Sequence, residues 1–149
     1  MAQYTIGYIH YGGQGVPQDL KKAVKWFRKA AEQGFAMAQY SLGNLHYSGE
    51  GVQQDFKEAA RWFRKAGEQG LALAQHSLGV MYASGDGVPI NDVKAYAWYI
   101  QSAFNGHPDG VKERDLIAKK MTPEQIAQAQ ALSKKLMEQI LKNKKKQVK

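Results

Sequence analysis

Residues 38–70 read AQYSLGNLHYSGEGVQQDFKEAARWFRKAGEQG, and closely similar segments occur 36 positions earlier and 36 positions later. The earlier segment is AQYTIGYIHYGGQGVPQDLKKAVKWFRKAAEQG, and the later one is AQHSLGVMYASGDGVPINDVKAYAWYIQSAFNG. The first two are identical at 21 of 33 positions without an insertion, which chance does not produce. A fixed period of this length indicates a repeat protein in which each unit is one supersecondary element.

The middle repeat predicts a first helix that ends in a glycine turn. Leu42 and His46 fall on one face of this helix, which we expect to end near Ser48. Gly49 and Gly51 then predict a helix stop and a tight turn, because glycine adopts positive φ at little cost. The same Gly-x-Gly spacing is found in phosphate-binding loops, but such a loop is needed once, whereas this turn recurs in all three repeats.

The second half of the repeat predicts an amphipathic helix. Asp55 is suited to its N-cap, and Glu58 three residues later has the spacing of a capping box. Gly70 closes the helix. The positions that we expect to be buried, spaced i, i+4 and i+7, are Ala59, Phe63 and Ala66.

The pattern AQYSLGxxHYSGxGVxxDxxxAxxWFRKAxEQG resembles the Sel1-like repeat family, a relative of the tetratricopeptide solenoids. The resemblance covers three units, residues 1–36, 37–72 and 73–106, of which the first is truncated at its start. It implies an all-α solenoid of antiparallel helix pairs, stacked into a right-handed superhelix. It also implies a scaffold or adaptor for other proteins.

Residues 107–149 depart from the repeat and predict helices that cap its last unit, followed by a basic tail. Asp109 is placed to cap a helix that reaches about Lys120, and Thr122, followed by proline and by Gln125, is a strong helix start. Because an uncovered terminal repeat is poorly soluble, we expect these helices to pack on the third repeat, with the lysine-rich end solvated and frayed. The alternative is that the basic amphipathic helix binds an anionic surface, either membrane or nucleic acid.

Composition and charge exclude several kinds of site. The chain has no cysteine, so disulfides, thiolate metal sites and cysteine nucleophiles are excluded. Of the net charge of +8, residues 1–106 contribute +2 (ten basic and eight acidic side chains) and residues 107–149 contribute +6 (eleven and five). No apolar run approaches the ~18–20 residues of a membrane span, so we expect a soluble protein. No secretory leader is visible, which favours the cytoplasm; a periplasmic or secreted location would require that a leader has been removed.

The sequence offers no catalytic constellation, and we expect neither an enzyme nor a bound cofactor or metal. His10 and His46 stand where the family usually has tyrosine, and as equivalents in consecutive repeats they should lie ~10 Å apart. That is too far for both to bind one zinc ion. We therefore interpret each as filling a tyrosine-sized inner position with one nitrogen hydrogen-bonded. No serine has a repeating histidine partner, and no two carboxylates are placed to act as general acid and base.

By analogy with tetratricopeptide proteins, the first helix of each pair should line a concave groove that binds a partner protein or peptide. Tyrosine rings there would provide a stiff contact area with hydrogen-bonding tips, which suits an extended peptide or a helix. An open alternative is that several rings pack on neighbouring repeats and expose only their hydroxyls. The candidate groove residues are Tyr4, Tyr8, Tyr11, Tyr40, Asn44, Tyr47, His76 and Val80.

Aromatic and basic residues alternate in the WFRKA segments at 26–30 and 62–66, a pattern that superficially resembles a nucleic-acid contact. We interpret the aromatic residues as core positions, and Arg28 and Lys29 with their equivalents as a solvated helix end, where cations suit the dipole. Together with the low charge of the repeats, this disfavours nucleic acid and membrane as partners. The exposed end at Met1 also allows self-association with a second copy.

Overall fold

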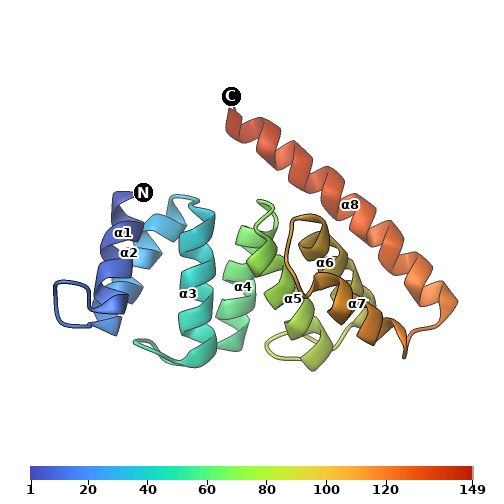
Figure 1. Ribbon diagram of the computed structural model, residues 1–149, viewed down its shortest axis with the longest axis horizontal. Helices are drawn as coiled ribbons and strands as arrows, with labels where there is room; N and C mark the ends of the chain where they lie inside the picture. Colours follow the sequence, from blue (N-terminus) through green and yellow to red (C-terminus); the bar gives the residue numbers. More distant parts are fainter. Residues whose placement is uncertain (149) are drawn as a thin grey trace. The chain divides into compact units, whose positions relative to one another are not determined.

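A computed structural model describes residues 1–148, and all of their regular structure is α-helical. The helices follow one another through short connections (Figure 1). They form two compact units, the first over residues 1–66 and the second from Gly67 onward. None of the helices within residues 1–148 combines the length and the apolar character needed to cross a bilayer. Their bounds are α1 Ala2–Gly12, α2 Leu20–Glu32, α3 Ala36–Ser48, α4 Phe56–Gly67, α5 Ala72–Ser84, α6 Asp92–Phe104, α7 Gly110–Ala118 and α8 Pro123–Val148.

The Gly-x-Gly turn ends the first helix of every repeat, as predicted. Gly49 follows α3 in the left-handed region, with φ of 75°, and its N–H donates to the carbonyl of Leu45 at 2.8 Å. Gly51 has φ of 72°, and a Cβ there would lie 2.5 Å from the carbonyl oxygen of Leu20. Glycine is therefore required at position 51 both by the backbone conformation and by the close approach of the turn to α2. The equivalent glycines Gly13, Gly15, Gly85 and Gly87 also have positive φ.

The second helix of each repeat starts at a side-chain cap. The Asp55 carboxylate accepts a hydrogen bond from the backbone N–H of Glu58 at 3.0 Å, as predicted. The other half of the expected capping box does not form, because the N–H of Asp55 donates to the carbonyl of His46 at 2.8 Å instead. The Glu58 carboxylate pairs with Arg61 at 3.2 Å. In the third repeat the cap is Asn91, which accepts from the N–H three residues later.

A glycine in the middle of each first helix lets an aromatic ring of the second helix lie against its backbone. A Cβ built on Gly43 would lie 2.7 Å from a ring carbon of Phe63, closer than real side chains approach. This contact explains why glycine occupies a helix interior, where it is costly relative to alanine. The pairs with this contact are Gly7 with Phe27, Gly43 with Phe63, and Gly79 with Tyr99.

The two tryptophans of the first unit differ in burial although they are equivalent in the repeat. Trp62 is 1% exposed and packs in a cluster with apolar residues of α2 and α3, as expected for a core position. Trp26 was predicted to be core as well, but it is only half-buried, and the ammonium of Lys29 lies 4.5 Å from its ring centroid. The reason is that α2 covers Trp62, whereas no earlier helix pair among the described residues covers Trp26.

In the second unit, α8 packs against α6 and ends on the loop before α5. The buried Gln101 amide of α6 donates to the carbonyl and the hydroxyl oxygen of Ser133 at 2.8 and 2.7 Å. Farther along α8, Asn143 donates to the carbonyl of Glu68 at 3.1 Å, and Gln147 bonds the side chain of Gln69 at 3.0 Å. These anchors explain why α8 stays helical to its last described residue, where fraying was expected.

The start signals of the last two helices differ in outcome. Thr122 and Gln125 form the predicted capping box, with reciprocal bonds of 3.1 and 2.9 Å. Asp109 stands at the N-cap of α7 as expected, but its side chain makes no capping bond. The backbone N–H of Asp109 donates a hydrogen bond to Nδ1 of His107 at 3.1 Å.

Candidate functional site: a tyrosine-lined pocket

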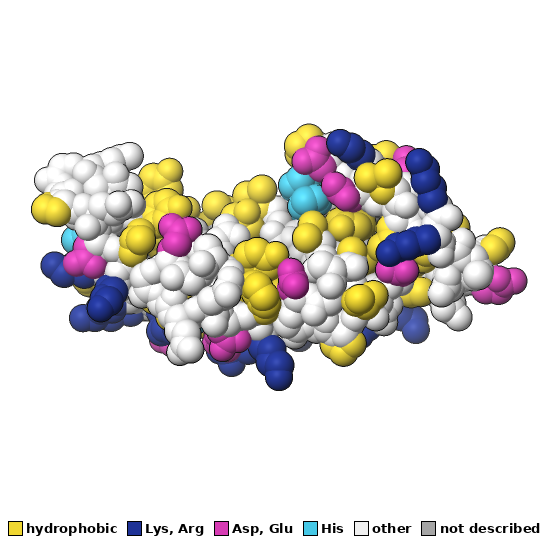
Figure 2. Space-filling view, turned by 90° about the horizontal axis from the view of Figure 1, so that it is seen from below, with side chains coloured by type: hydrophobic (Ala, Val, Ile, Leu, Met, Phe, Trp, Pro, Cys, Tyr) yellow, Lys and Arg dark blue, Asp and Glu magenta, His cyan; other side chains and the backbone are white. Residues whose placement is uncertain are grey.

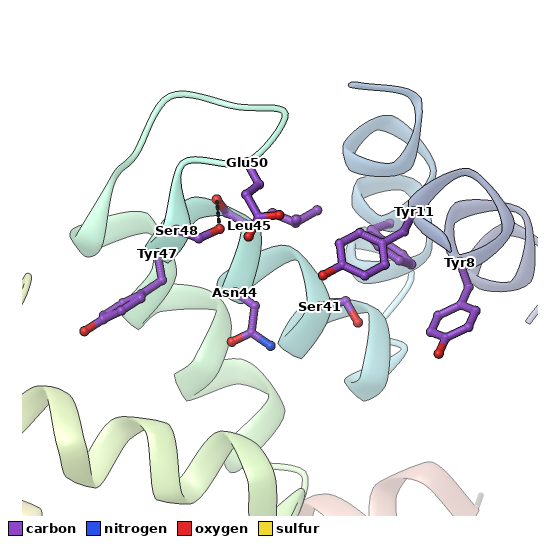
Figure 3. A pocket seen from close by; sticks show the side chains of 9 residues that line it. Tyr8, Tyr11, Ser41, Asn44, Leu45, Tyr47, Ser48 and Glu50 are labelled. Atoms are coloured by element: carbon purple, nitrogen blue, oxygen red, sulfur yellow. Dashed lines mark hydrogen bonds between the residues drawn. The ribbon is translucent and has the colours of Figure 1, made fainter. Parts of the chain in front are cut away.

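The first unit contains a pocket between α1 and α3, with a volume of about 350 Å³ (Figure 3). That volume lies within the ~300–1,000 Å³ typical of protein ligand sites. The pocket combines aromatic, hydroxyl, amide and carboxylate side chains. Its lining residues are Tyr8, Tyr11, Phe27, Ser41, Asn44, Leu45, Tyr47, Ser48 and Glu50.

The two walls come from equivalent positions of consecutive repeats. Tyr8 and Tyr11 stand three residues apart on α1 and therefore share one helix face. Their side chains are 51% and 38% exposed, and the Tyr11 hydroxyl points toward α3 (Figure 3). Asn44 and Tyr47, 36 positions later, occupy the same places on α3. The repeat thus builds the pocket by setting one helix face beside its copy.

The floor of the pocket is part of the core. Phe27 is 2% exposed, and Leu45 is also buried. The Phe27 ring is held against α1 at Gly7, and its centroid lies 6.5 Å from that of Tyr11. Because a close-packed ring has no free space to move into, the floor should keep its shape without a ligand.

The rim on the α3 side is ordered by local bonds at the helix end. The Ser48 hydroxyl donates to the carbonyl of Leu45 at 3.4 Å, and the Gln54 amide donates to the carbonyl of Tyr47 at 2.9 Å. The Tyr47 ring packs on Phe56 with centroids 4.9 Å apart. These contacts hold the rim residues in a defined arrangement before any partner arrives.

Four of the predicted groove residues, Tyr8, Tyr11, Asn44 and Tyr47, lie together at this pocket. Tyr4 does not line it and packs instead between Phe27 and Phe35, with centroid distances of 5.5 and 5.0 Å. Tyr40 is likewise outside it and lies 5.7 Å from the Phe63 ring. For these two rings, the structure places tyrosine against neighbouring aromatic side chains.

His76 and Val80 belong to the second unit and are not part of this pocket. The His76 ring stacks on His107, with centroids 4.0 Å apart and planes inclined by 6°. Burial and the neighbouring His107 lower the pKa of His76 below its usual value of 6.5. Val80 is half-buried. A separate cavity of about 200 Å³ in this unit has neither of them in its lining, which consists of Ala83, Tyr99, Glu113, Leu116, Ile117 and Lys120.

His46 lies in the core beside the pocket wall. Its Nε2 is 3.2 Å from Nη2 of Arg28, and a guanidinium only donates, so Nε2 accepts and the proton of the neutral ring is on Nδ1. Burial and the nearby Arg28 lower the pKa of His46 below 6.5. Arg28, expected on a solvated helix face, is therefore half-buried in this contact. Its reach to a histidine 18 residues away is not visible in the helix pattern.

Five residues that line the pocket were not predicted to belong to a binding surface: Phe27, Ser41, Leu45, Ser48 and Glu50. Phe27 was predicted to be a core residue, and no role at a binding surface was predicted for Leu45 or for the two serines. Glu50 was not assigned at all, although it carried a signal: it is the variable residue inside a Gly-x-Gly turn, with Gln14 and Asp86 as its equivalents. Within residues 1–148, no three His, Asp or Glu side chains are gathered as metal ligands.

The Sel1 repeat profile matches residues 1–35, 36–71 and 72–107. The chain belongs to the Sel1 repeat family. Sel1 repeats generally mediate interactions between proteins.

Two solved structures of Sel1 repeat proteins resemble this one. A protective antigen of uropathogenic Escherichia coli strains with an SLR fold has a TM-score of 0.86 and 43% identity, over 93% of this chain. A Sel1 repeat protein from Oxalobacter formigenes has a TM-score of 0.78 and 37% identity, over 80% of this chain. These matches span only 30% and 49% of those two proteins. The two structures confirm the predicted all-α solenoid of helix pairs. No curated protein sequence matches this chain.

Proposed function

We propose that this Sel1 repeat protein is a non-catalytic scaffold or adaptor that holds a partner protein or peptide at the tyrosine-lined pocket. The observation that carries the proposal is the gathering of Tyr8, Tyr11 and Tyr47 around one cavity with a buried floor. Tyrosine supplies a large contact area with few rotatable bonds, and it is enriched among the residues that dominate protein interfaces. The nearby Asn44 amide adds a hydrogen-bonding group that an extended peptide backbone can use.

The test compares pocket and non-pocket variants of the full chain in affinity capture, with mass spectrometry of the captured proteins. Tyr8→Ala and Tyr11→Ala should lose partners while keeping wild-type helicity, because these residues are 51% and 38% exposed. Tyr47→Ala is a weaker test, because the Tyr47 ring also packs on Phe56 and its removal can affect stability as well as binding. Phe104→Ala is the matched control, because it removes an aromatic side chain that is 70% exposed and far from the pocket in sequence.

The result expected is a set of proteins retained by wild type and Phe104→Ala and lost by both tyrosine variants. Identical capture by all four chains would overturn the proposal. If Tyr8→Ala unfolds the first unit, the ring is structural, and its assignment to a binding surface is wrong.

The alternative function is binding of an anionic surface by the end of α8. The observation in its favour is that Lys142, Lys144, Lys145 and Lys146 are all exposed on an ordered helix. Binding to phosphates falls steeply with rising salt, whereas a tyrosine pocket is far less sensitive. Removal of residues 142–149 would abolish this activity and leave capture at the pocket intact.

A further inference from the structure

The pocket of the first unit is lined by one negatively charged side chain and by no positively charged one. Glu50 is the one residue with a full charge among those that line it. In the view of Figure 3, its side chain lies between Ser48 and Tyr11. None of the ion pairs found in residues 1–148 engages Glu50, so its carboxylate is not neutralised by a neighbouring cation of the described chain.

The basic residues of the first unit lie on other helices. Residues 1–66 contain nine Lys or Arg, and all of them belong to α2 or α4. The pocket walls, α1 and α3, carry none. In Figure 2, the basic side chains in the part of the face that holds α1 to α4 gather along one edge. The net positive charge of the chain is therefore not located in the pocket.

Helix ends add to the negative potential of the pocket. Tyr11 lies in the last turn of α1, and Tyr47 and Ser48 lie in the last turn of α3. The C-terminus of a helix carries the negative end of the peptide dipoles, which favours a nearby cation. Two such ends and the Glu50 carboxylate thus meet at one cavity.

The aromatic walls favour the same kind of group. The face of a tyrosine ring attracts an ammonium or guanidinium group placed within about 6 Å of its centroid. The chain already makes such contacts elsewhere, for example between Lys65 and Trp62 at 4.8 Å. A long cationic side chain also has an apolar stem, which the buried floor of Phe27 and Leu45 can cover.

We infer that the pocket binds a peptide segment through an arginine or lysine side chain, which enters between Tyr11 and Tyr47 and pairs with Glu50. This inference rests on the proposed function, because it names the partner chemistry of the same pocket. A peptide carboxylate is the wrong ligand for this site, since it would meet Glu50 and two helix C-termini without a cation to pair with.

The test is a selection of random linear peptides displayed on phage against the full chain, repeated with Tyr11→Ala. Peptides that bind wild type and not Tyr11→Ala are pocket ligands, and they should be rich in arginine or lysine. For one such peptide, Glu50→Gln should weaken binding by about twofold to fivefold, the range of an exposed ion pair. Glu32→Gln, the same change at an exposed residue outside the pocket lining, should leave binding unchanged.

A second arm replaces the cationic residue of that peptide with neutral citrulline or norleucine. The loss caused by this replacement should be smaller in Glu50→Gln than in wild type, because the two groups are coupled. Pocket-dependent peptides without a basic residue, or equal losses in both backgrounds, would overturn the inference and leave the proposed function standing. If no selected peptide depends on Tyr11, the proposed function fails instead.

Discussion

Replacing Gly7 with alanine should destabilise the first unit, because the new methyl group enters the ring that forms the pocket floor. A Cβ at this position would lie 2.7 and 2.8 Å from two ring carbons of Phe27. Favourable carbon–carbon contacts are about 3.5–4.0 Å, so the ring would have to move by nearly 1 Å. Phe27 is buried, and its neighbours in the core would have to move with it. Overpacking of this kind costs about 1–3 kcal/mol.

Gly12→Ala is the matched control in the same helix. The nearest atom to a Cβ at Gly12 is Cγ of Gln14 at 3.5 Å, an ordinary contact with an exposed side chain. Alanine stabilises a helix interior by up to about 1 kcal/mol relative to glycine, and less at the last residue of α1. The overpacking cost less this gain leaves a net loss of up to about 2 kcal/mol of unfolding free energy for Gly7→Ala. Gly12→Ala should lose none, so the Gly7 variant should be the less stable of the two.

Urea unfolding measured by tryptophan fluorescence in a Trp98→Phe background would follow the first unit, because Trp26 and Trp62 then remain as the reporters. Adding Phe27→Leu to Gly7→Ala should recover part of the loss, since the shorter side chain removes the ring that the methyl group meets. Equal stability of the Gly7 and Gly12 variants, or additive losses in the double variant, would show that the Phe27 ring does not clash with the new methyl group.

Three further predictions concern the rest of the chain. Lowering the pH from about 7 to about 5 should reduce the unfolding free energy, because the pKa values of His46 and His76 are lowered by folding. The unfolded chain takes up protons first, so the loss begins near 6.5 and is complete below the folded pKa values; urea titrations at each pH measure it. Gln101→Leu should destabilise the second unit by about 1–2 kcal/mol, and Ser133→Ala by less, since the Ser133 carbonyl remains as an acceptor. Asp55→Ala should cost about 1 kcal/mol in thermal or urea unfolding, because α4 loses its N-cap.

Helix ends were the most predictable feature, because their chemistry is local. Asp55 caps α4 and Thr122 caps α8 through bonds that span three residues, so the sequence pattern contains both partners. The same reasoning failed for the second half of the box at Asp55. There the backbone N–H has a better acceptor in His46, which the turn brings back to it.

The binding surface was only partly predictable. Tyr4, Tyr8 and Tyr11 stand at helical spacing on α1, but this spacing could not say which rings point into space and which meet another ring. Tyr4 and Tyr8 are one helical turn apart, and only Tyr8 lines the pocket. The difference comes from Phe35, which stands at the start of α3 and packs against Tyr4.

The repeat, its helix pairs and its glycine turns could be predicted from the amino-acid sequence alone. Helix ends and turns have local signals within a few residues, and the 36-residue period shows these signals three times. The sequence did not predict that α1 and α3 enclose a pocket, that Phe27 is its floor or that Glu50 is the one lining residue with a full charge. These relations join residues from different helices, and their geometry is set by how side chains pack rather than by where they stand in the repeat.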